Sequence, residues 1–311
     1  MPVFLYIAIF IVSIAVLLYA SDHFVDAAER IGLAMGIPSF IIGVTIVAFG
    51  TSLPELATSI ASIYSGASEV VVGNAVGSNI TNILLVLGIT AVVGKGIKID
   101  YDVMNTDIPM LFGAAVLLYF SLLDLHLSTI ECVLFLLALV VFLGNSFKGD
   151  GSVDESKEKT KIRPIDWGIV VVAGLFIYLG ANYTIYSLTN IAESFNIPTH
   201  VIAITVVALG TSLPEVVVSI NAAKKGKHAM AVGNVLGSNI FNTYAVMAIP
   251  GLMTDLKIPQ ETMDFSIPFM VFVTVIFGII CISKQISKWE GYMLLLFYAY
   301  FISTLLEKQI G

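Results

Sequence analysis

Apolar stretches long enough to cross a lipid bilayer recur along the whole of this 311-residue chain. A helix needs about 20 consecutive apolar residues to cross the hydrocarbon core. Because 58% of the residues are hydrophobic and only 12% are charged, the chain is predicted to be an all-α membrane protein rather than a soluble domain. The ten predicted transmembrane helices cover residues 3–20, 38–64, 69–93, 106–123, 127–147, 166–187, 198–223, 228–253, 265–283 and 290–306.

Lysine and arginine residues divide unevenly between the two sets of alternate loops. Of the 15 basic residues, all but Lys257 and Lys308 fall in one set. The positive-inside rule assigns this lysine-rich side to the cytoplasm. A multi-pass cell-membrane protein is therefore expected, with both termini outside and the polar segment 148–165 as a flexible cytoplasmic linker.

Two sequence blocks occur twice in the same order. Residues 48–55 (AFGTSLPE) match 208–215 (ALGTSLPE), and residues 73–82 (GNAVGSNITN) match 233–242 (GNVLGSNIFN) in the same register. A shared register over separate blocks indicates a duplication. The predicted units are a first repeat at 1–147 with its motif at 43–82, and a second repeat at 166–311 with its motif at 203–242.

Each predicted repeat contains five helices, which is an odd number. The second repeat must then enter the membrane from the side opposite to the first, so the prediction is two inverted five-helix repeats. Inverted repeats bring their matched blocks together near the bilayer midplane, where secondary transporters place substrate and coupling-ion sites. We therefore expect one central site shared by both repeats.

The repeated motif contributes one glutamate from each copy, Glu55 and Glu215. A carboxylate near the bilayer centre costs at least ~2.5–3.5 kcal/mol on insertion scales, so it needs a partner. No Lys, Arg or His lies in the middle of a motif helix, which leaves a bound cation or a proton to neutralise these groups. Two carboxylates match the charge of a divalent ion.

Neutral oxygen donors precede each glutamate at helical spacing. Thr51 and Ser52 lie on the same helix face as Glu55. Pro54 removes a backbone amide and crowds the preceding turn, so carbonyl oxygens there are expected to be free. The second copy repeats these residues as Thr211, Ser212 and Pro214.

The second block places a polar side chain at every fourth position, which forms a stripe on one helix face. These residues are Asn74, Ser78 and Asn82 in the first repeat and Asn234, Ser238 and Asn242 in the second. Carboxylate, carbonyl, hydroxyl and amide oxygens together suit hard cations such as calcium or sodium. Structural roles compete with this interpretation: Gly-x-x-x-Gly patterns pack membrane helices closely, and Ser52 and Ser212 are able to bond to their own helices.

At these motifs the chain resembles the calcium/cation antiporter superfamily, and most closely its sodium/calcium exchanger branch of prokaryotic type. The resemblance extends over essentially the whole chain. It implies that Glu55 and Glu215 bind calcium together with the Thr51 and Thr211 carbonyls. The further ligands that it implies are Ser78, Ser238 and the Ala48 and Ala208 carbonyls for sodium, with Asn82 and Asn242 lining the centre.

The expected function is secondary active, electrogenic exchange of Na⁺ for Ca²⁺ by alternating access. The expectation includes no enzymatic activity, no cofactor, no nucleic acid and no obligate protein partner; the two ions and the lipid bilayer are the expected partners. A proton-coupled calcium exchanger with the same site is the closest alternative. A passive cation channel and an intramembrane hydrolase are further alternatives, although a hydrolase needs few neutral oxygen ligands.

Overall fold

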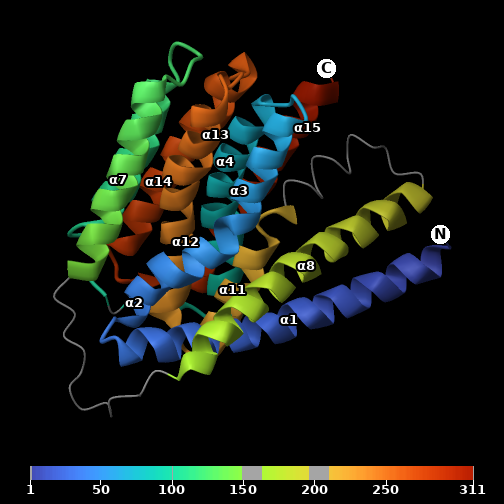
Figure 1. The fold of residues 1–311 in the computed structure, drawn as a ribbon, viewed down its shortest axis with the longest axis vertical. Helices are drawn as coiled ribbons and strands as arrows, with labels where there is room; N and C mark the ends of the chain where they lie inside the picture. The colour runs from blue at the N-terminus through green and yellow to red at the C-terminus, as the bar shows by residue number, and fades with distance from the viewer. Residues whose placement is uncertain (1, 100, 149–162, 196–209, 311) are drawn as a thin grey trace.

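The computed structural model describes residues 2–99, 101–148, 163–195 and 210–310, and it is almost entirely helical (Figure 1). The α-helices are α1 (Val3–Ala34), α2 (Ser39–Ile42), α3 (Ala48–Tyr64), α4 (Glu69–Thr81), α5 (Leu87–Val93), α6 (Asp107–Ser121), α7 (Thr129–Lys148), α8 (Pro164–Ser194), α11 (Leu213–Lys224), α12 (His228–Phe241), α13 (Met247–Met253), α14 (Ile267–Cys281) and α15 (Lys288–Ile310). The π-helical segments are η1 (Gly43–Val47), η2 (Asn82–Val86), η4 (Asn242–Val246) and η5 (Thr262–Ser266).

Seven helices in the described ranges are long and apolar enough to cross a membrane. They cover Val3–Ala34, Ser39–Tyr64, Glu69–Val93, Thr129–Phe147, Pro164–Ser194, Thr262–Cys281 and Lys288–Glu307. These helices confirm the predicted all-α, multi-pass membrane protein. Of the other predicted spans, 106–123 corresponds to the shorter apolar helix α6, 228–253 to α12 through α13, and 198–223 is described only from Gly210 onward.

The helices α1 and α8 are longer than the spans predicted at 3–20 and 166–187. The prediction ended the first span where acidic residues begin, but α1 continues through Asp22, Asp26 and Glu29. These acids form ion pairs with Lys225 and Lys227, and these contacts compensate their charges within the helix. The polar end of α1 is therefore stabilised by tertiary contacts that apolar length does not reveal.

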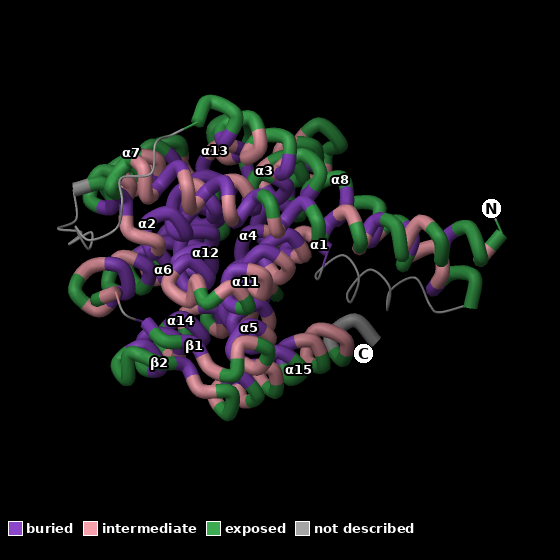
Figure 2. Tube along the Cα trace, turned by 90° about the horizontal axis from the view of Figure 1, so that it is seen from below, coloured by how far each residue is buried: buried purple, intermediate pink, exposed green. Residues whose placement is uncertain are grey.

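The molecule has two parts that differ in orientation (Figure 1). Helices α1 and α8 run alongside each other and lie obliquely to a bundle formed by the remaining helices. Within the bundle, α4 and α12 occupy the buried centre, as the tube coloured by burial shows (Figure 2). Every residue of α12 from Met230 to Phe241 is buried. The polar stripe of the second repeat is thus held in the protein interior rather than facing lipid.

Short local signals set the starts of two peripheral helices. Before α7, the Ser128 amide donates to the Glu131 carboxylate (2.8 Å) and the Glu131 amide donates to Ser128 Oγ (3.3 Å). Before α15, Ser287 and Glu290 make the same reciprocal pair at 2.7 and 3.2 Å. Such capping boxes satisfy backbone amides that have no helical partner, and they fix where each helix begins.

Glycines allow α12 to lie against α2 and η1 at backbone contact. A Cβ atom added at Gly233 would overlap the Phe40 carbonyl oxygen, and one at Gly237 would overlap the Val44 carbonyl oxygen. At Gly73 and Gly77 of α4, an added Cβ would meet nothing within 4 Å. The close-packing role considered for both Gly-x-x-x-Gly pairs is therefore present at α12 and absent at α4.

A small antiparallel sheet joins two loops on the lysine-rich side. Strand β1 (Ile97–Lys98) follows α5, and strand β2 (Gln285–Ile286) follows α14. Ile97 pairs with Ile286 and Lys98 pairs with Gln285. The sheet connects distant parts of the chain at the end of the bundle seen in Figure 2.

Candidate functional site

The two motif glutamates lie in the centre of the bundle and both are 0% exposed. Glu55 lies on α3, and Glu215 lies in the first turn of α11. Ser52, one turn before Glu55, donates a hydrogen bond to Glu215 Oε1 (3.1 Å). This bond brings the segments that carry the two glutamates into contact.

Threonines and serines of opposite repeats contact each other beside the glutamates. The Thr51 and Ser238 hydroxyls lie 3.5 Å apart, and the Ser78 and Thr211 hydroxyls lie 3.4 Å apart. These two contacts join equivalent positions of the duplicated sequence. Four of the predicted ligand residues are therefore arranged as two matching pairs across the centre.

The asparagines at the start of each stripe are held by serines that were not among the predicted site residues. Asn74 Nδ2 donates to Ser59 Oγ (3.0 Å), and Asn234 Nδ2 donates to Ser219 Oγ (2.9 Å). Each serine lies four residues after its glutamate, which places it on the same helix face. That spacing, present in both copies, is the signal that could have identified the two serines.

Several buried polar atoms at this centre have no hydrogen-bond partner on another residue. Among the described side chains they are both carboxylate oxygens of Glu55, Oε2 of Glu215, Oγ of Ser212, both amide atoms of Asn82 and Asn242, and Oδ1 of Asn79 and Asn239. An unsatisfied buried polar group costs about 1–3 kcal/mol, so such groups are rare unless a ligand or water completes them. Their concentration around two carboxylates indicates a site for a hard cation, which prefers oxygen ligands.

Two further asparagines, Asn79 and Asn239, lie next to the stripe residues in the duplicated block and link α4 to the second half of the chain. Asn79 Nδ2 donates to Thr243 Oγ1 (2.9 Å), and Asn239 Nδ2 donates to the Asn79 carbonyl oxygen (3.3 Å). Both residues occur in the duplicated block, but they lie outside the Asn-x-x-x-Ser-x-x-x-Asn register that predicted the ligands. Their role in joining α4 to α12 became visible only in the fold.

No basic side chain from the described part of the chain forms an ion pair at this centre. The ion pairs among the described residues involve Arg30, Arg163, Lys225 and Lys227, which lie at the lysine-rich ends of helices. No group of three or more His, Cys, Asp or Glu that could hold a metal occurs in the same ranges either. The donor set is two carboxylates with neutral oxygens, which suits sodium or calcium better than zinc or copper.

A cavity of about 310 Å³ reaches one side of the site. Its lining includes Thr58, Gly73, Asn74, Ser78, Thr211 and Thr262. These residues lead from the centre toward the ends of α3 and α14 that lie away from the lysine-rich side. On the lysine-rich side, Thr51, Asn234 and Ser238 are buried and hydrogen-bonded together.

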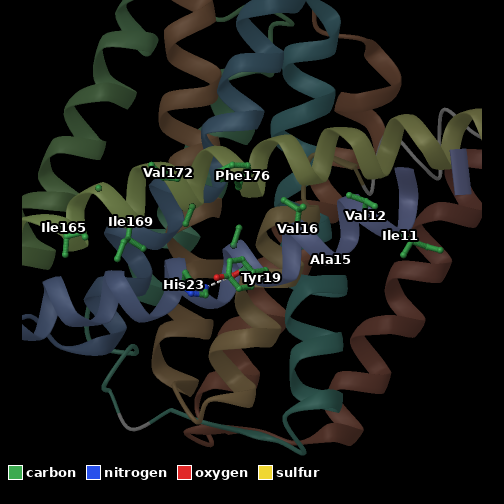
Figure 3. Close-up of a pocket in the computed structure, with 13 residues that line it drawn as sticks. Ile11, Val12, Ala15, Val16, Tyr19, His23, Ile165, Ile169, Val172 and Phe176 are labelled. Carbon is green, nitrogen blue, oxygen red and sulfur yellow. Dashed lines mark hydrogen bonds between the residues drawn. The ribbon is translucent and has the colours of Figure 1, made fainter. Parts of the chain in front are cut away.

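A larger cavity of about 960 Å³ lies between α1 and α8, away from the glutamates (Figure 3). Its lining is apolar apart from Tyr19 and His23, and His23 Nδ1 is 3.0 Å from the Tyr19 carbonyl oxygen. Two lining residues, Ile11 and Val12, are exposed on the apolar outer surface. This space lacks the converging oxygen atoms that a cation needs.

The remaining predicted ligands are the two alanine carbonyls. Ala48 begins α3, and its carbonyl oxygen accepts a hydrogen bond from Thr51 Oγ1 (3.3 Å). Ala208 lies outside the described residues.

The chain is similar in sequence to known membrane exchangers. The family model described as "Sodium/calcium exchanger protein" matches residues 5–148 and 165–306. Sodium/calcium exchanger MaX1 of Methanosarcina acetivorans is 33% identical over 96% of this chain and 97% of its own length. The inner membrane protein YrbG of Escherichia coli is 32% identical over 93% of this chain and 92% of its own length.

Solved structures give the same grouping. The sodium-calcium exchanger NCX_Mj, soaked with zero Na⁺ and Ca²⁺, aligns with a TM-score of 0.85 at 30% identity and covers 98% of this chain and 100% of that chain. The same exchanger soaked with 2.5 mM Na⁺ and 1 mM Sr²⁺ also aligns with a TM-score of 0.85.

Proposed function

Because the chain belongs to the sodium/calcium exchanger protein family, we propose that it exchanges Na⁺ for Ca²⁺ by alternating access at the site around Glu55 and Glu215. One observation carries the proposal. Two fully buried carboxylates, one from each repeat, lie at the centre without an ion-pair partner among the described residues, surrounded by neutral oxygens that lack partners. A metal cation satisfies both the charge and the unpaired oxygens, which a helix-packing role does not.

The proposed ligands come from both repeats. Glu55 and Glu215 bind Ca²⁺ with the carbonyls of Thr51 and Thr211, and Na⁺ uses the same glutamates. The other proposed ligands and lining groups are Ser52, Ser78, Asn74, Asn82, Ala48, Ser212, Ser238, Asn234, Asn242 and Ala208. Support for this set is the contact pattern of the described members and the lack of another partner for Asn82 and Asn242.

We further propose that the chain is built from ten transmembrane helices in two inverted repeats. The support is a series of contacts that recur at equivalent positions, such as Asn74 with Ser59 and Asn234 with Ser219. Both polar stripes also continue into π-helical segments that begin at Asn82 and Asn242. A duplication in which each copy supplies half of one central site accounts for both features.

With the lysine-rich side in the cytoplasm, the cavity at Asn74 and Ser78 faces outward and the described conformation is outward-facing. Sodium and calcium then compete for overlapping ligands, and the site changes sides only when its carboxylates are neutralised. If the sodium charge entering exceeds the calcium charge leaving, the membrane potential drives extrusion, at ~2.3 kcal/mol per charge per 100 mV. Transport is therefore expected to be electrogenic.

The test is uptake of radioactive Ca²⁺ into proteoliposomes under an outward Na⁺ gradient, an outward proton gradient or no gradient. We expect uptake with the Na⁺ gradient alone, and loss of uptake to background in Glu55→Gln and in Glu215→Gln. Glu69→Gln is the matched control, because Glu69 is exposed at the start of α4. Uptake that needs a proton gradient would instead support the proton-coupled alternative, and uptake without any gradient would support a passive channel.

A further inference from the structure

Five exposed lysines gather around the small sheet on the lysine-rich side. We call Lys95, Lys98, Lys224, Lys284 and Lys288 the lysine platform. Figure 2 views this end of the bundle, where β1 and β2 lie close to the ends of α5, α11, α14 and α15. All five side chains are exposed, and none takes part in the ion pairs found in the described part of the chain.

The backbone holds these lysines at fixed positions. Lys98 lies on β1 opposite Gln285, and the Ile99 amide donates to the Lys284 carbonyl oxygen (2.8 Å). The Lys98 amide also donates to His228 Nδ1 (3.1 Å). A Cβ added at Gly94 would lie 3.5 Å from Ala223 Cβ, so the loop carrying Lys95 lies beside the end of α11, where Lys224 is located. Strand pairing and backbone hydrogen bonds therefore hold together the loops that carry Lys98 and Lys284.

Other lysines on this side, unlike those of the platform, form ion pairs with acidic residues. Lys225 Nζ lies 2.6 Å from Asp22 Oδ1, and Lys227 Nζ lies 2.9 Å from Glu29 Oε2. Beside the platform, the Glu290 carboxylate accepts hydrogen bonds from the Ser287 amide and hydroxyl (2.7 and 2.8 Å) and forms no ion pair with a described residue. Topology alone explains why basic residues lie on this side. It does not explain why five of them lie around one small sheet without an ion pair to a described acid.

Exposed aromatic residues place the platform at the depth of lipid headgroups. Trp289 and Tyr292 are 76% and 44% exposed, and their rings lie 5.8 Å apart just after Lys288. Tryptophan and tyrosine favour the interface between hydrocarbon and water. Leu296 and Tyr300 continue the exposed face of α15 at helical spacing, with exposures of 71% and 56%. An apolar track thus leads from the lysines toward the bilayer interior.

We propose that the lysine platform binds the headgroup of an anionic phospholipid, whose acyl chain lies along the exposed face of α15 formed by Trp289, Tyr292 and Leu296. The lysines supply positive charge to the phosphate, and the aromatic and aliphatic side chains contact the chain below it. A free anion would use only the first of these contacts. The proposal is independent of which ions the protein transports.

Tryptophan fluorescence offers a direct test, because the chain has two tryptophans and Trp289 adjoins the platform. In a Trp167→Phe protein reconstituted into mixed bilayers, quenching of Trp289 by brominated phosphatidylglycerol is compared with quenching by brominated phosphatidylcholine. Since each basic residue near an anionic surface contributes roughly fivefold in affinity, two lysines that contact one headgroup should give a preference of roughly 25-fold for phosphatidylglycerol. This preference should weaken as salt concentration rises.

Variants then assign the preference to the platform. Lys98→Gln/Lys284→Gln should reduce it to about twofold or less, whereas Lys98→Arg/Lys284→Arg should retain it because the charge is kept. Lys257→Gln/Lys308→Gln, which removes the same charge from the other set of loops, should leave it unchanged. Normal gel-filtration behaviour and unchanged Trp289 emission in pure phosphatidylcholine report a folded variant.

Three results would overturn the proposal. Equal quenching by the two brominated lipids would show that no anionic headgroup is selected. A preference that survives Lys98→Gln/Lys284→Gln would place the anionic lipid elsewhere. Loss of the preference on adding inorganic phosphate at constant ionic strength would show that a free phosphate occupies the lysines as well as a lipid does.

Discussion

Residues 50–55 and 210–215 both read Gly-Thr-Ser-Leu-Pro-Glu, yet the two copies have different backbones. In the first copy, α3 runs without interruption from Ala48 to Tyr64 and contains Pro54 in its interior. In the second copy, Thr211 and Ser212 form a turn and α11 begins at Leu213, which places Pro214 in its first turn. Proline is tolerated in a first turn but removes a hydrogen bond inside a helix.

This difference extends to the surroundings of the site. Asn74, Ser78 and Thr211 line the cavity, whereas the equivalent Asn234, Ser238 and Thr51 are sealed. Ser52 donates to Glu215, but Ser212 has no partner among the described residues and does not reach Glu55. Chemically equivalent residues therefore occupy inequivalent environments. In an alternating-access transporter, we expect the two halves to exchange these environments when the site opens to the other side.

The largest expected effect is on the free energy of unfolding, and it distinguishes the Gly-x-x-x-Gly pair of α12 from that of α4. Gly237→Ala forces a methyl group onto the Val44 carbonyl oxygen, so α12 and η1 must separate. We expect a loss of about 3 kcal/mol in the free energy of unfolding, or failure to fold, because overpacked interiors rarely relax without cost. Gly77→Ala is the matched control and should be neutral or slightly stabilising, because its methyl group meets nothing within 4 Å. Thermal denaturation in detergent measures both; equal losses would contradict the packing difference.

The next effect concerns access to the two polar stripes. A thiol introduced by Asn74→Cys should react with a membrane-impermeant thiol reagent, because Asn74 lines the cavity, whereas a thiol introduced by Asn234→Cys should not. The expected difference in rate is on the order of 100-fold, because the reagent must reach the thiolate. The native Cys132 and Cys281 are buried, so the unmodified protein provides the background. Similar rates for both variants would mean that the two sides are equally open.

A smaller effect should distinguish the two motif serines. Ser52→Ala removes a donor to the Glu215 carboxylate and should lower the stability of the cation-free protein by about 1.5–3 kcal/mol. Ser212→Ala removes a hydroxyl without a described partner, so it should be neutral or stabilising in the same assay. Thermal denaturation in chelator-treated, sodium-free buffer makes the comparison. Equal destabilisation would show that Ser212 has an equivalent bond in solution.

The smallest effect tests the ion pairs on the sealed side. Lys227 contacts Asp26 (2.6 Å) and Glu29 (2.9 Å) and its side chain is 13% exposed. Lys227→Gln should cost up to about 1 kcal/mol, since ion pairs near a surface contribute little. Lys224→Gln, at a lysine outside the described ion pairs, should change stability by less than about 0.5 kcal/mol. If high salt leaves the difference between the two variants unchanged, the interaction is not electrostatic.

The membrane class, the duplicated blocks and the principal candidate ligands were predictable from the sequence alone. Helix ends were predicted well where an apolar run ends at a turn, as for 69–93, because local hydropathy and turn residues act within a few positions. The two glutamates could be selected because a charge in an apolar span is energetically costly and finds no partner among its neighbours in the sequence. The capping boxes before α7 and α15 are likewise short-range features.

Tertiary contacts, by contrast, set which copy of the motif interrupts its helix, which glycine pair packs closely and which side of the site is open. Six identical residues adopt two conformations, so their own preferences cannot choose between them. The choice depends on what lies across from each copy: α2 and η1 pack against Gly233 and Gly237, whereas Gly73 and Gly77 line the cavity. Such contacts join residues far apart in the chain, and their free energies are set by packing and burial that no local pattern encodes.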